Sequence, residues 1–374
     1  MREIFRKLKF WLNIVGIHLN FLGNRIKYGI AIKEELKVNP QPNLTSAQKR
    51  EIKDYFAQFG FKRIKTHWHC FYGGFCDQYS KKYIPQDFFF SHLEVALNNE
   101  YYIALQDKNL LQSVFKDIQQ PKTVVSKING MFLMDNQIVS KNEAMDACLK
   151  SGKIIVKPTV ETYGGLGVAK LDLSTEDSDN RYTKLTKLFD SYRKDFIVQE
   201  IVDQSVEMKA LNETSLNTIR ISTYLRNDEV VVLFSVVRFG AKGVYVDNIS
   251  QGGFYCIIND DGSLHDRAFN TFKKTITKTD AGAVLKDFSI PNYNRVKEMV
   301  QVTHRRVPYF KMISWDIALD SNNFPVLIEF NAFGQSIDFQ SVCGPLFGDY
   351  TDEVLAIAKD FKEKRLRYSS ASRY

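Results

Sequence analysis

Residues 312–332 read MISWDIALDSNNFPVLIEFNA, and this stretch decides how the rest of the chain is interpreted. Two apolar runs of alternating pattern are separated by the tripeptide Ser-Asn-Asn at 321–323. Because asparagine tolerates a positive φ angle, Asn322-Asn323 is predicted to form the two-residue turn of a β-hairpin. In the register that this turn sets, Asp316 faces Glu329.

The two faces of this hairpin have different chemistry, because strand side chains alternate between the faces of a sheet. The apolar face is predicted to carry Ile317, Leu319, Val326, Ile328 and Phe330. The opposite face carries Asp316, Glu329 and Asn331. Two carboxylates and an amide oxygen are hard ligands that suit Mg²⁺, which commonly bridges to nucleotide phosphates. An ordinary half-exposed hairpin with scattered acids is the alternative that this segment leaves open.

Length and composition predict a globular protein of two or three domains. The chain has 374 residues, of which 44% are hydrophobic and 25% are charged, and these values exclude a wholly disordered chain. Its five cysteines are scattered and odd in number, which indicates a reducing compartment. His67, His69, Cys70 and Cys76 resemble a zinc cluster, but they lack paired Cys-x-x-Cys spacing and are interpreted as core or surface residues.

The net charge of +8 is concentrated at the two ends of the sequence. Residues 1–37 have a net charge of +5 and residues 359–374 a net charge of +4. The chain between them is close to neutral, which argues against a general nucleic-acid-binding surface. Both ends are candidates for contact with an anionic membrane surface, so the expected location is the cytoplasm, with contact to the inner face of the cell membrane.

The apolar run FWLNIVGIHLNFLG at 10–23 needs a separate interpretation. It is too short and too polar to span ~30 Å of hydrocarbon as a helix. No small-residue cleavage site follows it, which argues against a signal peptide. An amphipathic helix is expected instead, and its apolar side either packs on the domain or lies in a bilayer interface.

The pattern of elements predicts an α+β chain in four regions: a basic amphipathic segment at 1–38, a mixed and mostly helical domain at 44–122, and α+β subdomains at 123–200 and 201–374. Two prolines mark the linker at 39–43. Helices are predicted from Thr45 or Ser46 to Gly60 and at 108–118, 141–150, 183–194 and 294–307. Strands are predicted at 131–139, 153–158, 168–173, 196–202, 218–225, 230–240 and 252–260.

A glycine-rich loop follows the apolar strand that ends at Lys157, where residues 163–167 read YGGLG. Glycines let backbone N–H groups approach phosphate oxygens, and a nearby lysine supplies charge. The loop matches neither a P-loop nor a dinucleotide-binding fingerprint. A tight hairpin turn therefore stays the alternative until other residues support phosphate binding.

Arg220 lies in an otherwise apolar alternating strand, and the same argument applies to Arg238. An unpaired guanidinium there would be costly, so each arginine is expected to have a phosphate or carboxylate partner.

The order of these motifs supports a resemblance that covers residues 100–350. Lys108, Lys157 with its glycine loop, the strand ending in Gln199–Val202, Glu207, the arginines and the acidic hairpin follow one another as in the ATP-grasp superfamily, which the chain resembles. The spacing of the three hairpin ligands is similar to the metal motif of D-alanine–D-alanine ligases. The segments SLNTIRIST (215–223), VRFG (237–240), VDNISQGGF (246–254) and WDIAL (315–319) are similar to a narrower branch, associated with sugar transfer and surface-polysaccharide biosynthesis.

The resemblance implies an ATP-grasp fold, in which two α+β subdomains grip ATP, with a mostly helical N-terminal extension. It also implies roles for matching residues: Lys108 and Lys157 on the phosphates; Gly164, Gly165 and Gly167 as a mobile lid; Gln199, Glu200, Ile201 and Val202 as the adenine hinge; Glu207 on the ribose; Arg220 and Arg238 as catalytic cations; Asn248, Gly252 and Gly253 on the acceptor side; and Asp316, Glu329 and Asn331 on Mg²⁺. Lys108 as a solvated lysine, Glu207 as a loop acid and residues 248–253 as a plain turn are the alternatives.

The activity that the resemblance implies is ATP-dependent joining of a carboxylate to an amine through an acyl phosphate. The expected substrates are a small-molecule or lipid-linked saccharide carboxylate, or an amino acid, and an amine acceptor in surface polysaccharide biosynthesis. Two alternatives stay open: a kinase that phosphorylates a sugar hydroxyl, and a non-catalytic nucleotide-binding protein of a polysaccharide assembly.

Overall fold

The computed structural model describes residues 22–75, 78–159, 167–174, 178–241, 252–270 and 274–371, and it confirms the predicted α+β class with its antiparallel sheets. The chain divides into two compact units, of which unit 1 contains residues up to 99, 309–312 and 333 onward, and unit 2 contains 100–308 and 313–332. The predicted amphipathic segment before residue 22, Gly164, Gly165 and Asn248 lie outside the described residues.

Unit 1 is built mainly from helices around buried aromatic side chains. After a helix over 22–38 come α2 (Ser46–Gln58), α3 (His67–Phe75), α4 (Gln86–Phe88), η1 (Phe89–Leu93), α5 (Glu94–Leu97), α12 (Gln340–Cys343), η4 (Gly348–Tyr350) and α13 (Thr351–Ala371). Thr45, one of the two cap residues that the sequence predicted, caps α2 and forms a capping box with Gln48. No described helix is long and apolar enough to cross a membrane.

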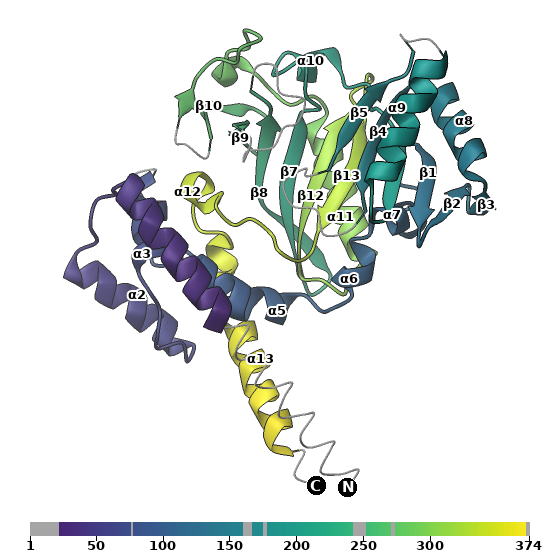
Figure 1. The fold of residues 1–374 in the computed structure, drawn as a ribbon. Coiled ribbons are helices and arrows are strands. Elements are labelled where there is room, and N and C mark those ends of the chain that lie inside the picture. The colour runs from purple at the N-terminus through teal and green to yellow at the C-terminus, as the bar shows by residue number, and fades with distance from the viewer. Residues whose placement is uncertain are drawn as a thin grey trace, which may run out of the picture. The chain divides into compact units, whose positions relative to one another are not determined.

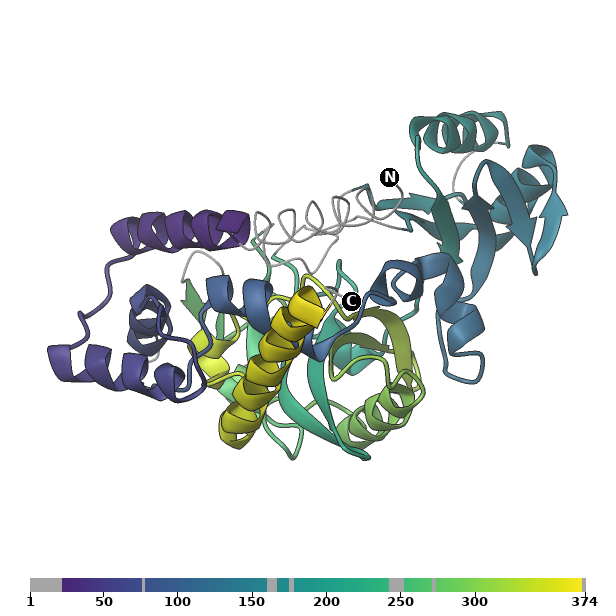
Figure 2. The same ribbon diagram turned by 90° about the horizontal axis from the view of Figure 1, so that it is seen from below.

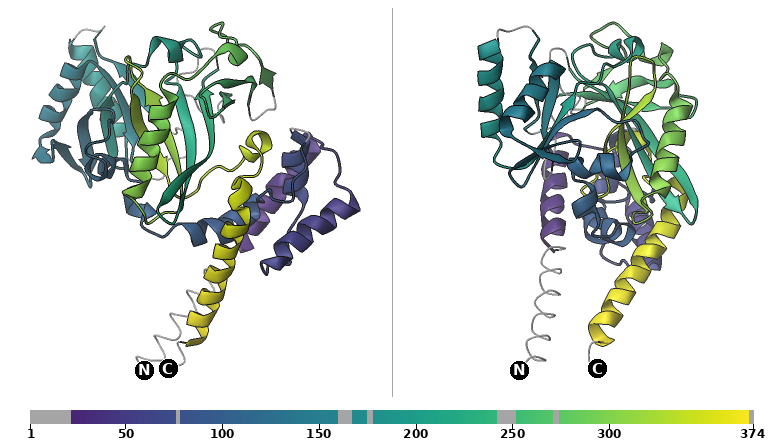
Figure 3. Two further views of the ribbon diagram at one scale, coloured as in Figure 1. Left: turned by 180° about the vertical axis from the view of Figure 1, so that it is seen from behind. Right: turned by 90° about the vertical axis from the view of Figure 1, so that its right-hand side faces the viewer.

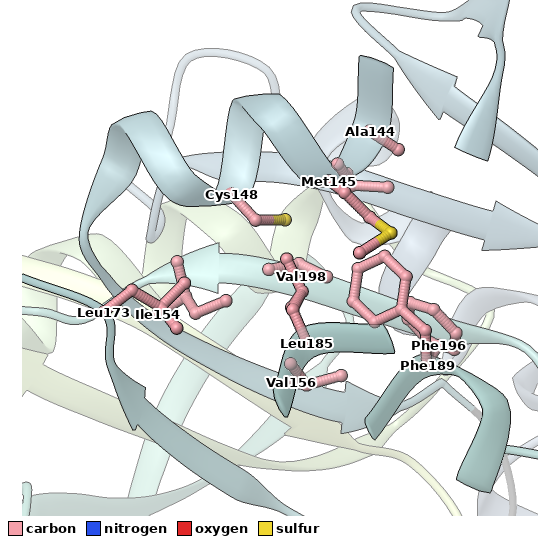
Figure 4. Packing of buried hydrophobic residues seen from close by; sticks show 11 residues of the cluster. Ala144, Met145, Cys148, Ile154, Val156, Leu173, Leu185, Phe189, Phe196 and Val198 are labelled. Atoms are coloured by element: carbon pink, nitrogen blue, oxygen red, sulfur yellow. The ribbon is translucent and has the colours of Figure 1, made fainter. Parts of the chain in front are cut away.

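The first sheet of unit 2 has six strands in the order β3-β2-β1-β6-β4-β5. Figure 1 labels β1 to β5 of this sheet. Its strands are β1 (Thr123–Ile128), β2 (Met131–Met134), β3 (Gln137–Val139), β4 (Lys153–Pro158), β5 (Ala169–Asp172) and β6 (Phe196–Glu200). Two helices, α8 (Lys141–Ser151) and α9 (Ser178–Ser191), pack on it (Figure 2). Met145 and Cys148 of α8 meet Phe189 of α9 and Val156 and Val198 of the sheet, which closes a fully apolar core (Figure 4).

Two features of this sheet differ from the sequence prediction. The single strand predicted at 131–139 is a hairpin, because Asp135 and Asn136 both adopt positive φ, at 46° and 63°. β1 was not predicted, although Asn129-Gly130 connects it to β2 with φ angles of 50° and 83°. Two consecutive residues with positive φ form the turn that matches strand twist, so an Asn-Gly pair is the signal that the pattern reading missed.

The second sheet has seven strands in the order β11-β10-β9-β8-β7-β12-β13. They are β7 (Thr218–Arg226), β8 (Glu229–Phe239), β9 (Phe254–Ile258), β10 (Leu264–Phe269), β11 (Thr275–Ile276), β12 (Met312–Leu319) and β13 (Pro325–Asn331). The remaining elements of unit 2 are α6 (Tyr102–Leu105), α7 (Lys108–Val114), α10 (Val206–Lys209), η3 (Leu285–Asp287) and α11 (Tyr293–Arg305). Helix α11 lies against the sheet at β7, β8 and β13 (Figure 3).

The turn between β12 and β13 corrects a prediction. The Asp320 N–H donates to the Phe324 carbonyl at 3.0 Å, so three residues form the turn where two were expected. The Asp320 carboxylate accepts the N–H groups of Asn322 and Phe324, both at 2.9 Å, and Asn323 takes a positive φ of 61°. An aspartate that binds its own turn favours this longer loop, and the two-residue reading overlooked it.

A β-bulge restores the predicted pairing at the polar end of the hairpin. The register shifts between Asp316 and Ile317, so Asp316 pairs with Glu329 as expected, while Ile317 pairs with Leu327. Val326 consequently pairs with Ala318, so its predicted position on the apolar face is wrong. Ile328 is the extra residue of the bulge.

Candidate active site

The apolar face of β12–β13 fixes which way the acids point. Trp315 pairs with Phe330, and their buried rings lie 5.6 Å apart. The Trp315 indole N–H donates to the Thr223 hydroxyl at 2.8 Å, which also lies 2.7 Å from His304 Nδ1 of α11. Because neighbouring strand residues face opposite ways, this packing directs Asp316 and Glu329 to the other face.

Asp316 is held by two arginines, one from the adjacent strand β7 and one from β8, the next strand along the sheet. Arg220 Nε donates to one carboxylate oxygen and Nη2 to the other at 2.8 Å, and Arg238 Nη2 lies 3.1 Å from Oδ1. The β7–β8 register places Thr218 opposite Arg238, and its hydroxyl accepts from Arg238 Nη2 at 2.7 Å. The expectation of a partner for Arg220 is thereby met, and the partner is a carboxylate of the predicted metal set.

This cluster is almost closed to solvent, because the exposed fractions of the three side chains are 12% for Arg220, 15% for Arg238 and 6% for Asp316. Burial raises the pKa of Asp316, but the charges and hydrogen bonds of Arg220 and Arg238 outweigh burial and leave the pKa below its ordinary value. The carboxylate is therefore ionised at neutral pH, as a metal ligand must be.

Lys108 reaches the same hairpin from α7. Asp107 caps this helix by accepting the Asn109 N–H at 2.9 Å, and the Lys108 N–H donates to the Thr159 carbonyl at 3.3 Å. Lys108 Nζ lies 3.2 Å from Glu329 Oε1, and its side chain is only 13% exposed. The alternative of a solvated first-turn lysine is therefore wrong.

Lys157 and Gln199 meet on the six-stranded sheet, where β4 and β6 pair. Lys157 Nζ donates to Gln199 Oε1 at 3.3 Å. Strand β6 ends at Glu200, whose carboxylate binds the exposed Lys122 at 2.7 Å, so Ile201 and Val202 follow the strand. The sequence predicted one strand over 196–202, and the structure shortens it.

Glu207 lies in the first turn of α10, behind the cap residue Ser205. Its own N–H and the Asn323 side chain hydrogen-bond to its carboxylate and lower its pKa. Glu207 is exposed, and Asn323 belongs to the β12–β13 turn, so this acid lies beside the hairpin on which the metal ligands were predicted.

Two of the described glycines of the predicted loops have local reasons to be glycine. Gly167 adopts a φ of 76°, and a Cβ there would come within 2.9 Å of the Pro158 ring. Gly252 adopts a φ of 90°. These two conformations favour glycine whether or not a ligand binds, so they add no support for phosphate or acceptor contacts. Gly253 leads into β9.

The donor set of Asp316, Glu329 and Asn331 fits a hard divalent cation. Glu329 and Asn331 are two residues apart on one strand, and Asp316 is the cross-strand partner of Glu329. Asn331 Nδ2 is buried without a hydrogen-bond partner among the described residues, an unusual state for an amide in a folded protein. No group of three His, Cys, Asp or Glu side chains forms a metal cluster in the described part of the chain. A metal site on this hairpin therefore needs Asn331 or another ligand in addition to Asp316 and Glu329.

Thr218 is the residue that sequence reasoning missed. It holds Arg238 through two hydrogen bonds, at 3.2 and 2.7 Å, and so aims that guanidinium at Asp316. Its signal was present, because Thr218 stands two residues before Arg220 and pairs with Arg238 when the β7–β8 hairpin is aligned.

Comparisons with known proteins agree with this architecture. The sequence profile of the sugar-transfer associated ATP-grasp family matches residues 91–347. The chain belongs to this family. A search of curated proteins found no match.

Several solved ligases are similar to this chain at a low level. The ATP-grasp ligase PsnB in complex with a minimal precursor has 14% identity and a TM-score of 0.40 over 70% of this chain and 64% of that one. The L-amino acid ligase from Bacillus licheniformis has 14% identity and a TM-score of 0.38 over 68% and 47%. D-alanyl-alanine synthetase A from Vibrio cholerae has 13% identity and a TM-score of 0.40 over 68% and 64%. The chain thus spans less than two thirds of the length of each.

Proposed function

We propose that this protein is an ATP- and Mg²⁺-dependent ligase that joins a carboxylate to an amine through an acyl phosphate. The observation that carries the proposal is the face of β12–β13 on which paired Asp316 and Glu329 lie against three cations, Arg220, Arg238 and Lys108. Membership of an ATP-grasp family supports ATP as the phosphoryl donor.

Four residue groups bind the nucleotide in this proposal. Lys108 and Lys157 contact its phosphates, and Gly164, Gly165 and Gly167 close over them. The segment Gln199, Glu200, Ile201 and Val202 contacts the adenine, and Glu207 accepts hydrogen bonds from the ribose hydroxyls. The burial of Lys108 beside Glu329 supports the first assignment, because a lysine held at the metal set is within reach of a bridging phosphate.

Asp316, Glu329 and Asn331 hold Mg²⁺ in this proposal. The bound ion supplies charge neutralisation on the phosphate oxygens of ATP. In the structure Arg220 and Arg238 compensate Asp316, and Lys108 compensates Glu329. We infer that these cations move partly from the carboxylates to the phosphates when nucleotide binds.

The two arginines also stabilise charge during the reaction. A substrate carboxylate oxygen attacks the γ-phosphorus of ATP, the bond to ADP breaks, and an acyl phosphate forms. The amine then attacks the acyl carbon, and the resulting tetrahedral oxyanion collapses with loss of phosphate and of the amine proton. Arg220 and Arg238 stand as preorganised cations for both charged species.

The family description supports a substrate class for this proposal. Sugar-transfer association supports a carboxylate or amine on a saccharide, or an amino acid joined to it, in surface polysaccharide biosynthesis. Asn248, Gly252 and Gly253 line the acceptor side in this proposal.

Hydroxylamine trapping tests the reaction. Purified protein is incubated with ATP, Mg²⁺ and a panel of uronic acids and amino acids, and both ADP and hydroxamate are measured. A ligase gives both products; ADP with phosphorylated sugar and no hydroxamate indicates a kinase, and bound ATP without ADP indicates a non-catalytic protein. The Asp316→Asn/Glu329→Gln variant should lose ADP formation, while Asp228→Asn, an exposed acid in the β7–β8 turn, should keep it.

A further inference from the structure

Unit 1 contains a pocket of about 250 Å³ whose lining is unusually basic. Arg25 of the first helix, Lys62 and Arg63 of the segment after α2, and Lys362 of α13 all line it, against one acid, Asp87. Basic residues from both ends of the sequence therefore line the same pocket, because Arg25 and Lys362 lie 337 residues apart along the chain.

One acid acts on these cations, because the charge of Arg25 lowers the pKa of Asp87 against the larger effect of burial. Within the described residues, none of the four forms an ion pair with an acidic side chain. Arg25 Nη2 donates to the Arg63 carbonyl at 2.8 Å, and Lys362 Nζ lies 3.4 Å from the Gly60 carbonyl, so backbone groups orient both side chains. A concave surface lined by one sign of charge concentrates counterions of the opposite sign.

The other lining groups agree with a positive pocket. His92 stacks on Phe88 with ring centroids 5.0 Å apart, and burial together with the charges of Arg25 and Lys362 lowers its pKa to about 4. Lys362 Nζ lies 5.2 Å from the centre of the Phe61 ring. The pocket thus combines four cations with a neutral aromatic wall.

We propose that this pocket binds a phosphate-bearing group, separately from the ATP-grasp site. Its volume is below the ~300–1,000 Å³ of sites for whole drug-sized ligands, so it takes a phosphate or diphosphate group rather than a complete nucleotide. Two arginines and two lysines suit an anion with more than one charge, because guanidinium groups bind phosphate oxygens in pairs and ammonium groups add point charges. The phosphate is either free in solution or the headgroup of an anionic lipid.

The test measures two kinds of binding by the full chain, with AMPPNP and Mg²⁺ in excess to fill the proposed nucleotide site. Inorganic pyrophosphate is titrated by calorimetry, and phosphatidylcholine vesicles with and without phosphatidic acid are used in sedimentation. The Arg25→Gln/Lys362→Gln variant should weaken binding about tenfold or more, as expected when two charge-assisted hydrogen bonds are lost. Lys53→Gln/Lys359→Gln is the matched control, because it removes the same charge from exposed positions on α2 and α13 outside the pocket.

Loss of pyrophosphate binding in the pocket variant alone supports a free anion, and loss of vesicle binding alone supports a lipid headgroup. Equal loss in both double variants, or no binding of either probe by the unaltered chain, overturns the proposal. Lys62→Gln/Arg63→Gln repeats the test with two exposed side chains should the first variant fail to fold. ADP formation should be unchanged in every pocket variant, which separates this proposal from the proposed ligase activity.

Discussion

Replacing Arg220 by methionine removes the principal partner of a buried carboxylate. Asp316 receives two hydrogen bonds from Arg220 and one contact from Arg238 at 3.1 Å. Removing one partner of a buried ion pair typically costs ~3–5 kcal/mol. Because Arg238 stays in place, we expect Arg220→Met to lower the free energy of unfolding by ~3 kcal/mol near neutral pH.

The loss should depend on pH with a defined sign. In the unaltered protein the pKa of Asp316 is below its ordinary value, so its ionised form stabilises the fold above that value and the stabilisation is lost as pH falls through the folded-state pKa. In Arg220→Met, burial is less opposed and the pKa of Asp316 rises. The difference in unfolding free energy between the unaltered protein and Arg220→Met is therefore smaller in acid and larger toward neutral pH. It changes by ~1.4 kcal/mol for each unit by which the two pKa values of Asp316 differ.

Urea unfolding followed by circular dichroism at several pH values from about 3 to 7 measures this difference in unfolding free energy, because the folded-state pKa of Asp316 in the unaltered protein lies below its ordinary value. Arg193→Met, an exposed arginine of the same unit, is the control and should stay within ~0.5 kcal/mol of the unaltered protein. Adding Asp316→Asn to Arg220→Met should remove the pH dependence. If Arg220→Met unfolds like the control at every pH, the ion pair does not hold Asp316 as described.

Four further outcomes are expected. Glu329→Gln should raise the Mg²⁺ concentration for half-maximal ADP formation by about tenfold or more, because it removes a charged ligand; an unchanged Mg²⁺ titration would exclude Glu329 from the metal set. Arg238→Met should lower turnover by ~10²–10³, measured as ADP release at saturating substrate. Burial raises the pKa of Glu94 to about 8, so unfolding free energy should fall as pH rises from about 4.5 toward 8, and Glu94→Gln should flatten that slope in urea titrations. Thr45→Ala should cost ~1 kcal/mol by loss of the α2 cap, seen in thermal unfolding, without a change in activity.

The sequence predicted the strands of the site well, because the alternation of apolar and polar residues there agreed with one assignment of the two faces. Asp316 opposite Glu329 followed from the pattern, and the partner expected for Arg220 exists. That this partner is Asp316 was not foreseen, since it depends on β7 lying beside β12, and neighbour order in a sheet is a long-range property.

Local turn chemistry accounts for most of the misses. The aspartate that lengthens the turn at 321–323, and the bulge that restores the register, offset each other within one hairpin. Strict alternation along a strand does not reveal two one-residue register shifts that cancel, because each shift alone would move every following side chain to the other face. The grouping of residues 333 onward with the N-terminal helices likewise rests on contacts between distant segments.

A structure of the full chain with AMPPNP and Mg²⁺ tests the account most directly. We predict Mg²⁺ bound by oxygens of Asp316, Glu329 and Asn331 and bridging to the phosphates, with Lys108 Nζ moved from Glu329 toward a phosphate oxygen. Nucleotide bound elsewhere, or Asp316 still fully paired with both arginines beside bound nucleotide, would contradict the account.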